Sequence, residues 1–213
     1  LFDEIKKNLL SYNYEILFID DYSTDKSIEI INKIKQDNKF IQLHKNNSNR
    51  GQSFSIYKGI KASKSNNIIT IDADLQNDPK DISILFLKYI NDPEVKLVSG
   101  VRIKRQDNFI KIISSKIANK IRSIYLGDKC PDTGCSLKVF EKKIIMHFEY
   151  FNGIHRFIPS LYEGIGCKVL YINVNHRHRK YGKSNYGISN RLFIGIKHLF
   201  QVKKILNEKD LND

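Results

Sequence analysis

Two hydrophobic patterns alternate along the chain and predict strands and helices in turn. Short, nearly uninterrupted apolar runs, such as EILFID at 15–20 and NIITID at 67–72, are typical of buried strands. Apolar residues three positions apart, such as Ile28, Ile31 and Ile34, predict amphipathic helices. Strands are expected at 15–20, 40–44, 67–72, 96–101, 137–140 and 168–174. Helices are expected at 2–10, from Ser23 or Asp25 to about 36, at 51–63, from Pro79 onward, and at 109–125, 154–164 and 186–206.

This alternation predicts an α/β fold. Strands separated by helices form a mostly parallel sheet with helices on both faces, so we expect a three-layer α/β/α arrangement in one domain, 1–213. Ligands of such sheets bind beyond the carboxyl ends of the strands. Two expected strands end in aspartates, Asp20-Asp21 and Asp72-Ala73-Asp74. The binding site is therefore expected at this acidic edge.

Composition and charge narrow the class of partner. The 213 residues are 41% hydrophobic and 11% aromatic, values typical of a globular protein with a substantial core. The formal net charge of +13 implies an anionic partner: nucleic acid, an acidic membrane surface or a phosphate-bearing small molecule. Charge alone does not choose among them. Three cysteines without a regular framework indicate a reducing compartment.

The second acidic segment has the chemistry of a metal site. Asp72, Asp74 and Gln76 alternate along the sequence, so an extended chain would place all three side chains on one side. Two carboxylates and an amide oxygen are suitable ligands for Mg²⁺ or Mn²⁺ that shares a diphosphate. The alternative is a solvated acidic turn, with Pro79 at the start of the next helix.

The first acidic segment predicts a nucleotide contact. A carboxylate of Asp20 or Asp21 facing the crevice can accept hydrogen bonds from a base N–H or from ribose hydroxyls. The alternative is ordinary helix capping, for which Ser23 or Asp25 is suited. Two adjacent aspartates exceed what capping requires.

Together these segments resemble family 2 glycosyltransferases. IDDYSTDKS is similar to the V-D-D-G-S-x-D motif of that family, and DADLQNDP to the D-A-D-L-Q-x-P-P motif of its polyprenyl-phosphate branch, the dolichol-phosphate mannosyltransferases and their bacterial relatives. The resemblance extends over about 15–191. Further matching segments follow in the same order: 49–52 (NRGQ), 99–102 (SGVR) with Arg105, 132–135 (DTGC), 155–159 (HRFIP), 176–179 (HRHR) and 182–184 (GKS).

The resemblance implies a GT-A fold and an inverting transfer from a UDP- or GDP-linked sugar to a polyprenyl phosphate. About 1–150 would bind the nucleotide sugar and about 151–213 the acceptor. The implied nucleotide-sugar contacts are Asp20, Asp21, Gln52 and Asp72, and the implied ligands of Mg²⁺ or Mn²⁺ are Asp72, Asp74 and Gln76. The implied acceptor-phosphate contacts are His155, Arg156, Arg177, Arg179, Lys183 and Ser184.

The resemblance also implies the catalytic residues Arg102, Arg105 and Asp132. Guanidinium groups suit phosphate oxygens because they bind them bidentately. A lipid phosphate is already ionised at pH 7, so it needs positioning more than deprotonation. Asp132 is the best candidate for a general base if one exists, and its alternative role is that of a turn aspartate before Gly134.

The helix expected at 186–206 is basic and amphipathic, with Ile188, Leu192, Ile196 and Leu199 on one face. Such a helix can lie in the interface of an anionic membrane, or it can pack on the domain. We expect a peripheral protein at the cytoplasmic face of a membrane.

Two other functions remain open at this stage. The same donor site could serve another acceptor, such as a lipid A precursor or a cell-surface glycan. A basic nucleic-acid-binding module would explain the charge but not the aspartates at the strand ends, so we expect no nucleic-acid partner. The family's first strand, with its Pro-x-Tyr-Asn-Glu loop, has no counterpart before Leu1, so we expect a fragment or processed form that lacks this wall of the nucleotide pocket.

Overall fold

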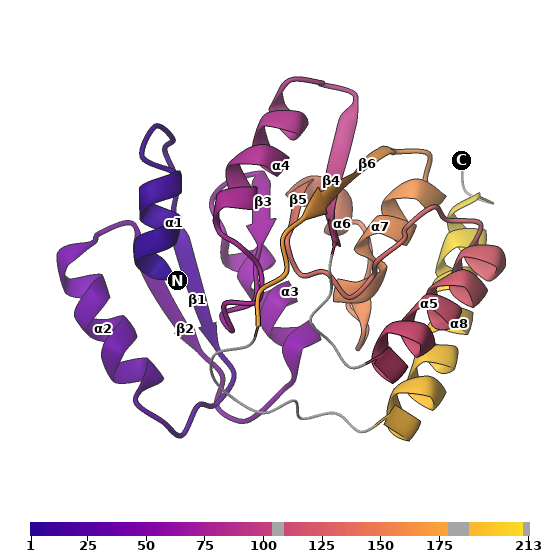
Figure 1. The fold of residues 1–213 in the computed structure, drawn as a ribbon, viewed down its shortest axis with the longest axis horizontal. Coiled ribbons are helices and arrows are strands. Elements are labelled where there is room, and N and C mark those ends of the chain that lie inside the picture. Colours follow the sequence, from indigo (N-terminus) through magenta and orange to yellow (C-terminus); the bar gives the residue numbers. More distant parts are fainter. Residues whose placement is uncertain (104–108, 179–187, 211–213) are drawn as a thin grey trace.

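The computed structural model describes residues 1–103, 109–178 and 188–210, which form alternating helices and strands (Figure 1). The strands are β1 Ile16–Asp20, β2 Ile41–Lys45, β3 Asn67–Thr70, β4 Val95–Arg102, β5 Lys138–Glu141 and β6 Lys168–Val174. The helices are α1 Phe2–Asn8, α2 Ser27–Asp37, α3 Gln52–Ala62, α4 Lys80–Ile90, α5 Phe109–Leu126, α6 Lys142–Ile145, α7 Ile154–Gly164 and α8 Ile188–Asp210. The predicted α/β class is confirmed.

The strands form two hydrogen-bonded groups. β1 pairs with β2 in parallel, and the other four strands lie in the order β3-β5-β4-β6. β4 and β6 are parallel, whereas β5 runs antiparallel to both of its neighbours, β3 and β4. β3, β4 and β6 therefore share one direction, and β5 is the reversed strand in an otherwise parallel arrangement.

The layers follow from the alternation of side chains along each strand. Leu97 of β4 and its partner Phe140 of β5 face one side, in a core shared with α3, α7 and α8. The next residues, Val98 and Val139, face the other side, in a core shared with α1 and α4. All four side chains have no exposed surface. The predicted three layers are thus present.

Helices on opposite faces connect the two groups of strands. Gly59 of α3 lies against Ile19 of β1, where an added Cβ would be 3.0 Å from the Ile19 side chain. On the other face, Ile5 of α1 packs in the same core as Ile16 of β1 and Ile69 of β3. The strand pair that carries Asp20 is therefore fixed relative to the larger group without strand pairing between β1 and β3.

Several element boundaries differ from those predicted. β3 ends at Thr70 rather than residue 72, because the backbone N–H of Asp72 leaves the sheet and donates to Ser136 Oγ, at 3.0 Å. α2 begins at Ser27, whose N–H donates to the Asp25 carboxylate at 2.9 Å. The four-residue α6 was not predicted, since one helical turn is too short to show a period. Of the helices in the described ranges, none combines the length and apolar character that crossing a membrane requires.

Candidate active site

The two acidic segments lie on one side of the molecule, where β1, β3 and β4 end (Figure 1). The first turn of α3 connects them. The backbone N–H of Gly51, just before α3, donates to Asp21 Oδ2 at 2.8 Å, and the side-chain amide of Gln52 donates to Asp72 Oδ1 at 2.8 Å. Gly51 has a φ of +84°, a conformation that favours glycine. The predicted residues Asp21, Gln52 and Asp72 are therefore brought together.

Asp21 is hydrogen-bonded within the protein. Oδ1 accepts from the Asn46 amide and from the Arg50 backbone N–H, both at 2.8 Å, in addition to the Gly51 bond to Oδ2. Burial raises the pKa of Asp21, but the hydrogen bonds from Arg50, Asn46 and Gly51 outweigh burial and hold the pKa below its ordinary value. This carboxylate therefore fixes the loop that leads into α3.

Asp20 is 7% exposed, and its Oδ2 accepts the Ser23 N–H at 3.2 Å. This bond closes the turn after β1. Asp20 thus supports the loop beside Asp21 through a local turn bond.

The segment that follows β3 turns instead of staying extended. Asp74 Oδ1 accepts the backbone N–H of Gln76 at 3.1 Å, and Leu75 has a φ of +63°. The expected extended placement of Asp72, Asp74 and Gln76 is therefore wrong, because this local bond folds the chain into a turn. Burial, and next the negative charge of Asp74, raise the pKa of Asp72. Two carboxylates crowded in this way favour a cation between them.

Arg102 and Asp132 form a bidentate ion pair. Arg102 Nε and Nη2 donate to the two carboxylate oxygens of Asp132 at 2.7 and 2.8 Å, and the Arg102 backbone N–H adds a third bond. The Gly134 backbone N–H also donates to Asp132 Oδ1, at 3.2 Å. The two side chains are 14% and 6% exposed. Because both carboxylate oxygens already hold the guanidinium, the geometry favours positioning over proton transfer for Asp132.

The predicted acceptor contacts are only partly described. Arg177 pairs with Glu4 at 2.7 Å and with Asp78 at 2.6 Å, so its guanidinium joins α1 to the acidic turn. Arg156 lies partly buried in the first turn of α7, beside His155. Four other predicted residues lie outside the described residues: Arg105, Arg179, Lys183 and Ser184.

His155 lies against the first turn of α3. Its Nδ1 is 2.7 Å from Ser53 Oγ. Burial, followed by the positive charges of Arg156 and Lys138 and the effect of His198, lowers the pKa of His155 to about 3. The imidazole is therefore neutral at pH 7 and contributes no positive charge to the site.

Sequence reasoning missed several residues that support the site. Ser136 Oγ accepts the Asp72 N–H and donates to Asn77 at 2.8 Å, while Asn46 donates to Asp21. Lys138 is 2% exposed and contributes positive charge that lowers the pKa of Asp72. The sequence offers one clue to Lys138, because a lysine inside an apolar strand segment is unusual. It offers no clue to Ser136 or Asn46, because their hydrogen-bond partners are distant in sequence.

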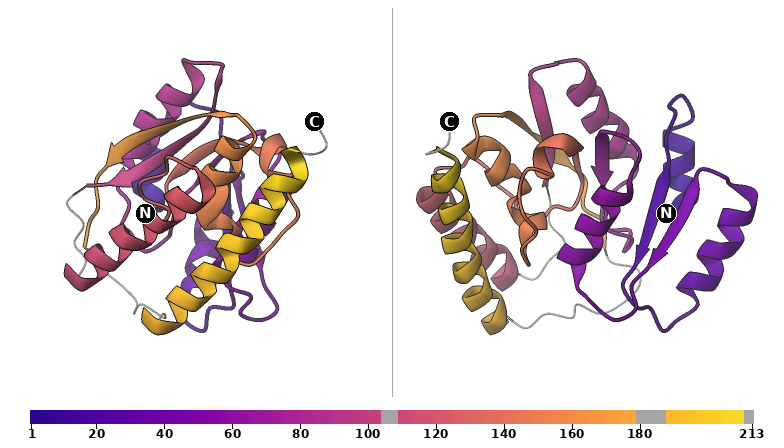
Figure 2. Two further views of the ribbon diagram at one scale, coloured as in Figure 1. Left: turned by 90° about the vertical axis from the view of Figure 1, so that its right-hand side faces the viewer. Right: turned by 180° about the vertical axis from the view of Figure 1, so that it is seen from behind.

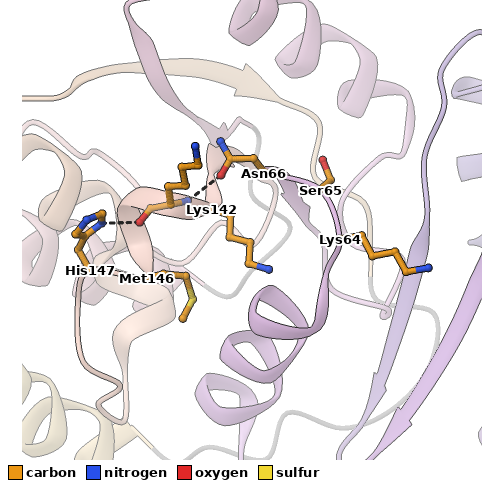
Figure 3. Close-up of a pocket in the computed structure, with 7 residues that line it drawn as sticks. Lys64, Ser65, Asn66, Lys142, Met146 and His147 are labelled. Carbon is orange, nitrogen blue, oxygen red and sulfur yellow. Dashed lines mark hydrogen bonds between the residues drawn. The ribbon is translucent and has the colours of Figure 1, made fainter.

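A cavity of about 450 Å³ lies elsewhere, between the start of β3 and α6 (Figure 3). Its lining includes Asn66, Lys142 and His147, whose polar groups largely serve the local structure. Lys142 Nζ donates to the Ser63 carbonyl at the end of α3, and Asn66 Oδ1 accepts the Lys143 N–H. His147 Nδ1 lies 2.6 Å from the Lys143 carbonyl oxygen. The acidic edge, where the strands end in carboxylates, is the better candidate for chemistry.

Comparison with known proteins identifies the family. The sequence profile of Glycosyl transferase family 2 matches residues 1–148, which include the two acidic segments, the first turn of α3 and the Arg102–Asp132 pair. The chain belongs to glycosyl transferase family 2.

Two curated relatives resemble this family 2 chain along most of its length. Dodecaprenyl-phosphate galacturonate synthase of Rhizobium johnstonii is 32% identical over 215 residues, which cover 98% of this chain and 63% of the relative. Undecaprenyl-phosphate 4-deoxy-4-formamido-L-arabinose transferase of Aeromonas hydrophila is 33% identical over 181 residues, covering 84% and 55%. The chain therefore spans about three fifths of the length of these relatives.

Solved structures show the same GT-A fold. Glucosyl-3-phosphoglycerate synthase of Mycobacterium tuberculosis, in complex with Mn²⁺ and UDP-glucose, gives a TM-score of 0.67 at 12% identity, over 93% of this chain and 72% of that chain. The mannosyltransferase PcManGT of Pyrobaculum calidifontis, in complex with GDP-mannose and Mn²⁺, gives 0.59 at 16% identity, over 85% and 53%. The predicted fold is confirmed.

Proposed function

We propose that this protein transfers a sugar from a UDP- or GDP-linked donor to a polyprenyl phosphate, with inversion at the anomeric carbon. The observation that carries the proposal is the connection of the two acidic strand ends through the first turn of α3, which places Asp21, Gln52 and Asp72 in one site. The names of the two curated relatives support the acceptor class.

Asp72, Asp74 and Gln76 would hold Mg²⁺ or Mn²⁺. The donor set fits such an ion, because the pKa of Asp72 is raised by burial and by the charge of Asp74, and a divalent cation would relieve this crowding. The bound ion would neutralise charge on the departing nucleoside diphosphate. Both structural neighbours named above contain Mn²⁺.

Arg102 would contact a phosphate near the reacting carbon, together with Arg105. Asp132 holds the Arg102 guanidinium by its two oxygens, which limits its freedom before a ligand binds. An ionised lipid phosphate can attack without a general base. We therefore assign Asp132 the role of orienting Arg102, with Arg156, Arg179, Lys183 and Ser184 on the acceptor side.

The Arg177 guanidinium already pairs with Glu4 and Asp78. Its role in the proposed reaction is to hold the acidic turn in place. In addition, its backbone N–H donates to the Gln76 carbonyl at 2.8 Å. Loss of this side chain would disturb the proposed metal site rather than remove an acceptor contact.

The protein would act at the cytoplasmic face of a membrane. Val202 and Leu206 of α8 are buried in the domain core. This part of the helix therefore packs on the domain, which was the alternative to a position in the membrane interface. Exposed apolar residues lie on the neighbouring helix α5, next to Phe200 of α8. We define the α5/α8 surface as Ile117, Ile121, Ile124, Tyr125 and Phe200, of which Ile124 is 76% and Phe200 60% exposed.

The α5/α8 surface suits an anionic lipid surface. The rings of Tyr125 and Phe200 are in contact, with centroids 5.5 Å apart, and α5 and α8 lie side by side at one end of the molecule (Figures 1 and 2). α5 contains lysines but no aspartate or glutamate, and its one arginine, Arg122, is buried against Asp128. Apolar side chains within a cationic helix are the features of an interfacial helix.

The test is a transfer assay with undecaprenyl phosphate, UDP- and GDP-linked sugars, and Mn²⁺. We expect a lipid-linked sugar with the wild type and at least about 100-fold less with Asp74→Ala, since the diphosphate would lose a metal ligand. Asp37→Ala, which removes an exposed aspartate at the end of α2, is the matched control. Absence of lipid-linked product, or transfer only to a lipid A precursor or a glycan, would overturn the proposal.

A further inference from the structure

Ser53 lies at the centre of a contact between three helices. Its hydroxyl oxygen is 2.7 Å from His155 Nδ1 and 2.7 Å from the backbone nitrogen of Gly153, and the residue is 2% exposed. Gly153 precedes α7 with a φ of +102°, and an added Cβ there would lie 2.3 Å from Nδ1 of His198 in α8. These contacts fix the backbone and both rings, so the hydroxyl has little freedom to find another partner.

The donors and acceptors around Ser53 determine the tautomer of His155. The Gly153 N–H can only donate, so Ser53 Oγ accepts from it. The single hydroxyl proton of Ser53 is then directed at His155 Nδ1, which must accept with its lone pair. A neutral imidazole that accepts at Nδ1 carries its proton at Nε2.

We propose that Ser53 is a positioning residue that fixes His155 in the Nε2–H form, so that a neutral ring donates a hydrogen bond to a phosphate oxygen bound at the acidic edge. The inference rests on the proposed function for the identity of the ligand. Among the described residues none is hydrogen-bonded to Nε2. Ser53 directly follows Gln52, whose amide donates to Asp72. Adjacent residues in the first turn of α3 therefore contact the His155 ring and the proposed metal ligand Asp72.

A neutral donor has a specific advantage at this position. Arg156 and the buried Lys138 already supply positive charge near the ring, and they lower its pKa to about 3 after the larger effect of burial. The Nε2–H donor is therefore present at every pH at which the protein is expected to work. The phosphate oxygen could belong to the donor diphosphate or to the acceptor lipid.

The first test is direct observation of the tautomer. In the ¹⁵N-labelled full chain, long-range ¹H–¹⁵N spectra distinguish a protonated ring nitrogen from an unprotonated one, and His155→Gln identifies the signals. We expect protonated Nε2 and unprotonated Nδ1 in the wild type and in Ser53→Thr, and a mixture of tautomers in Ser53→Ala. A protonated Nδ1 in the wild type would overturn the inference.

The second test identifies the phosphate. We expect the Nε2–H signal to shift with UDP or GDP plus Mn²⁺ if the donor diphosphate accepts, and with a short-chain polyprenyl phosphate if the acceptor does. A shift with neither ligand would leave His155 as a core histidine and overturn the proposal. These spectra need no turnover, so an inactive protein that shows the tautomer and the shift would contradict the proposed function and not this inference.

Kinetics provide the third readout. Ser53→Ala should lower kcat/KM about 10-fold, because the ring no longer keeps one tautomer, while Ser53→Thr should restore most of the rate. Ser65→Ala, an exposed serine in the loop before β3, is the matched control and should leave the rate unchanged. An equal loss in Ser53→Thr and Ser53→Ala, with both variants folded by circular dichroism, would contradict the proposal.

Discussion

At the scale of single residues, the site residues differ in the charges around them. Asp132 and Arg177 pair with opposite charges and Asp21 accepts backbone hydrogen bonds, whereas Asp72 accepts from Gln52 but also lies near the negative charge of Asp74. The sequence predicted these residues because strand ends and motif order are local features. It could not predict their partners, since Arg177 and Glu4 are 173 positions apart and meet only in the folded chain.

Asp21 leads to a prediction about acid stability. Its folded-state pKa is depressed, so the ionised carboxylate stabilises the fold above its ordinary pKa of about 4, and this contribution is lost as the pH falls through the lower folded value. Asp21→Asn should cost about 2 kcal/mol at pH 7, because backbone donors of the loop before α3 lose their acceptor.

The measurement is urea unfolding of the wild type and Asp21→Asn from pH 7 down to pH 3. The difference in free energy of unfolding should shrink as the pH falls below about 4. Asp37→Asn, at an exposed position, should differ little from the wild type at any pH. A difference that stays constant or grows on acidification would show that the Asp21 charge does not hold the loop.

At the scale of elements, hydrophobic periodicity predicted the strands and the longer helices, and packing decided the rest. The direction of β5 was not predictable, because alternation shows that a segment is a strand but not which way it pairs. Of the apolar face predicted for α8, Leu199 packs against the core, whereas the side chains of Ile188, Leu192 and Ile196 lie outside the described residues. β3 was predicted two residues too long, because Ser136 draws the Asp72 backbone out of the sheet.

A buried ion pair holds the loop that carries Asp132. It joins Arg122 of α5 to Asp128, at the start of that loop. Arg122 donates to Asp128 at 3.1 and 2.8 Å, and the two side chains are 4% and 2% exposed. Asp128 also accepts from Ser160 of α7, at 2.5 Å. The pair therefore connects two helices to the loop that orients Arg102.

Arg122→Ala should destabilise the protein by about 3–5 kcal/mol, because it leaves the buried Asp128 without its counter-charge. Lys120→Ala, two residues away at an exposed position of the same helix, should change stability by less than about 0.5 kcal/mol. The free energies come from urea unfolding followed by circular dichroism. Equal effects of the two substitutions would show that the ion pair does not anchor the loop.

At the scale of the whole molecule, the net charge of +13 and the α5/α8 surface together predict binding to anionic membranes. Ile121→Glu with Ile124→Glu places two negative charges on that surface. This double variant should bind vesicles containing phosphatidylglycerol at least about 10-fold more weakly than the wild type at low salt, since it loses apolar contact and gains repulsion.

The matched control is Ile30→Glu with Ile84→Glu, which changes two isoleucines that are 54% and 47% exposed on α2 and α4. Sedimentation with vesicles measures the bound fraction. Wild-type protein that stays in the supernatant, or equal losses in both double variants, would contradict the proposed surface. Dimerisation in solution without vesicle binding would assign the surface to a second copy of the chain.

The central claim is that the acidic edge binds a nucleoside diphosphate through a divalent ion. Calorimetric titration of UDP and of GDP, with and without Mn²⁺, tests it most directly, using the wild type, Asp74→Ala and the control Asp37→Ala. We predict Mn²⁺-dependent binding of one nucleotide to the wild type and the control, and at least about 10-fold weaker binding to Asp74→Ala. Binding that needs no metal and survives Asp74→Ala, or no binding of either nucleotide, would contradict the account.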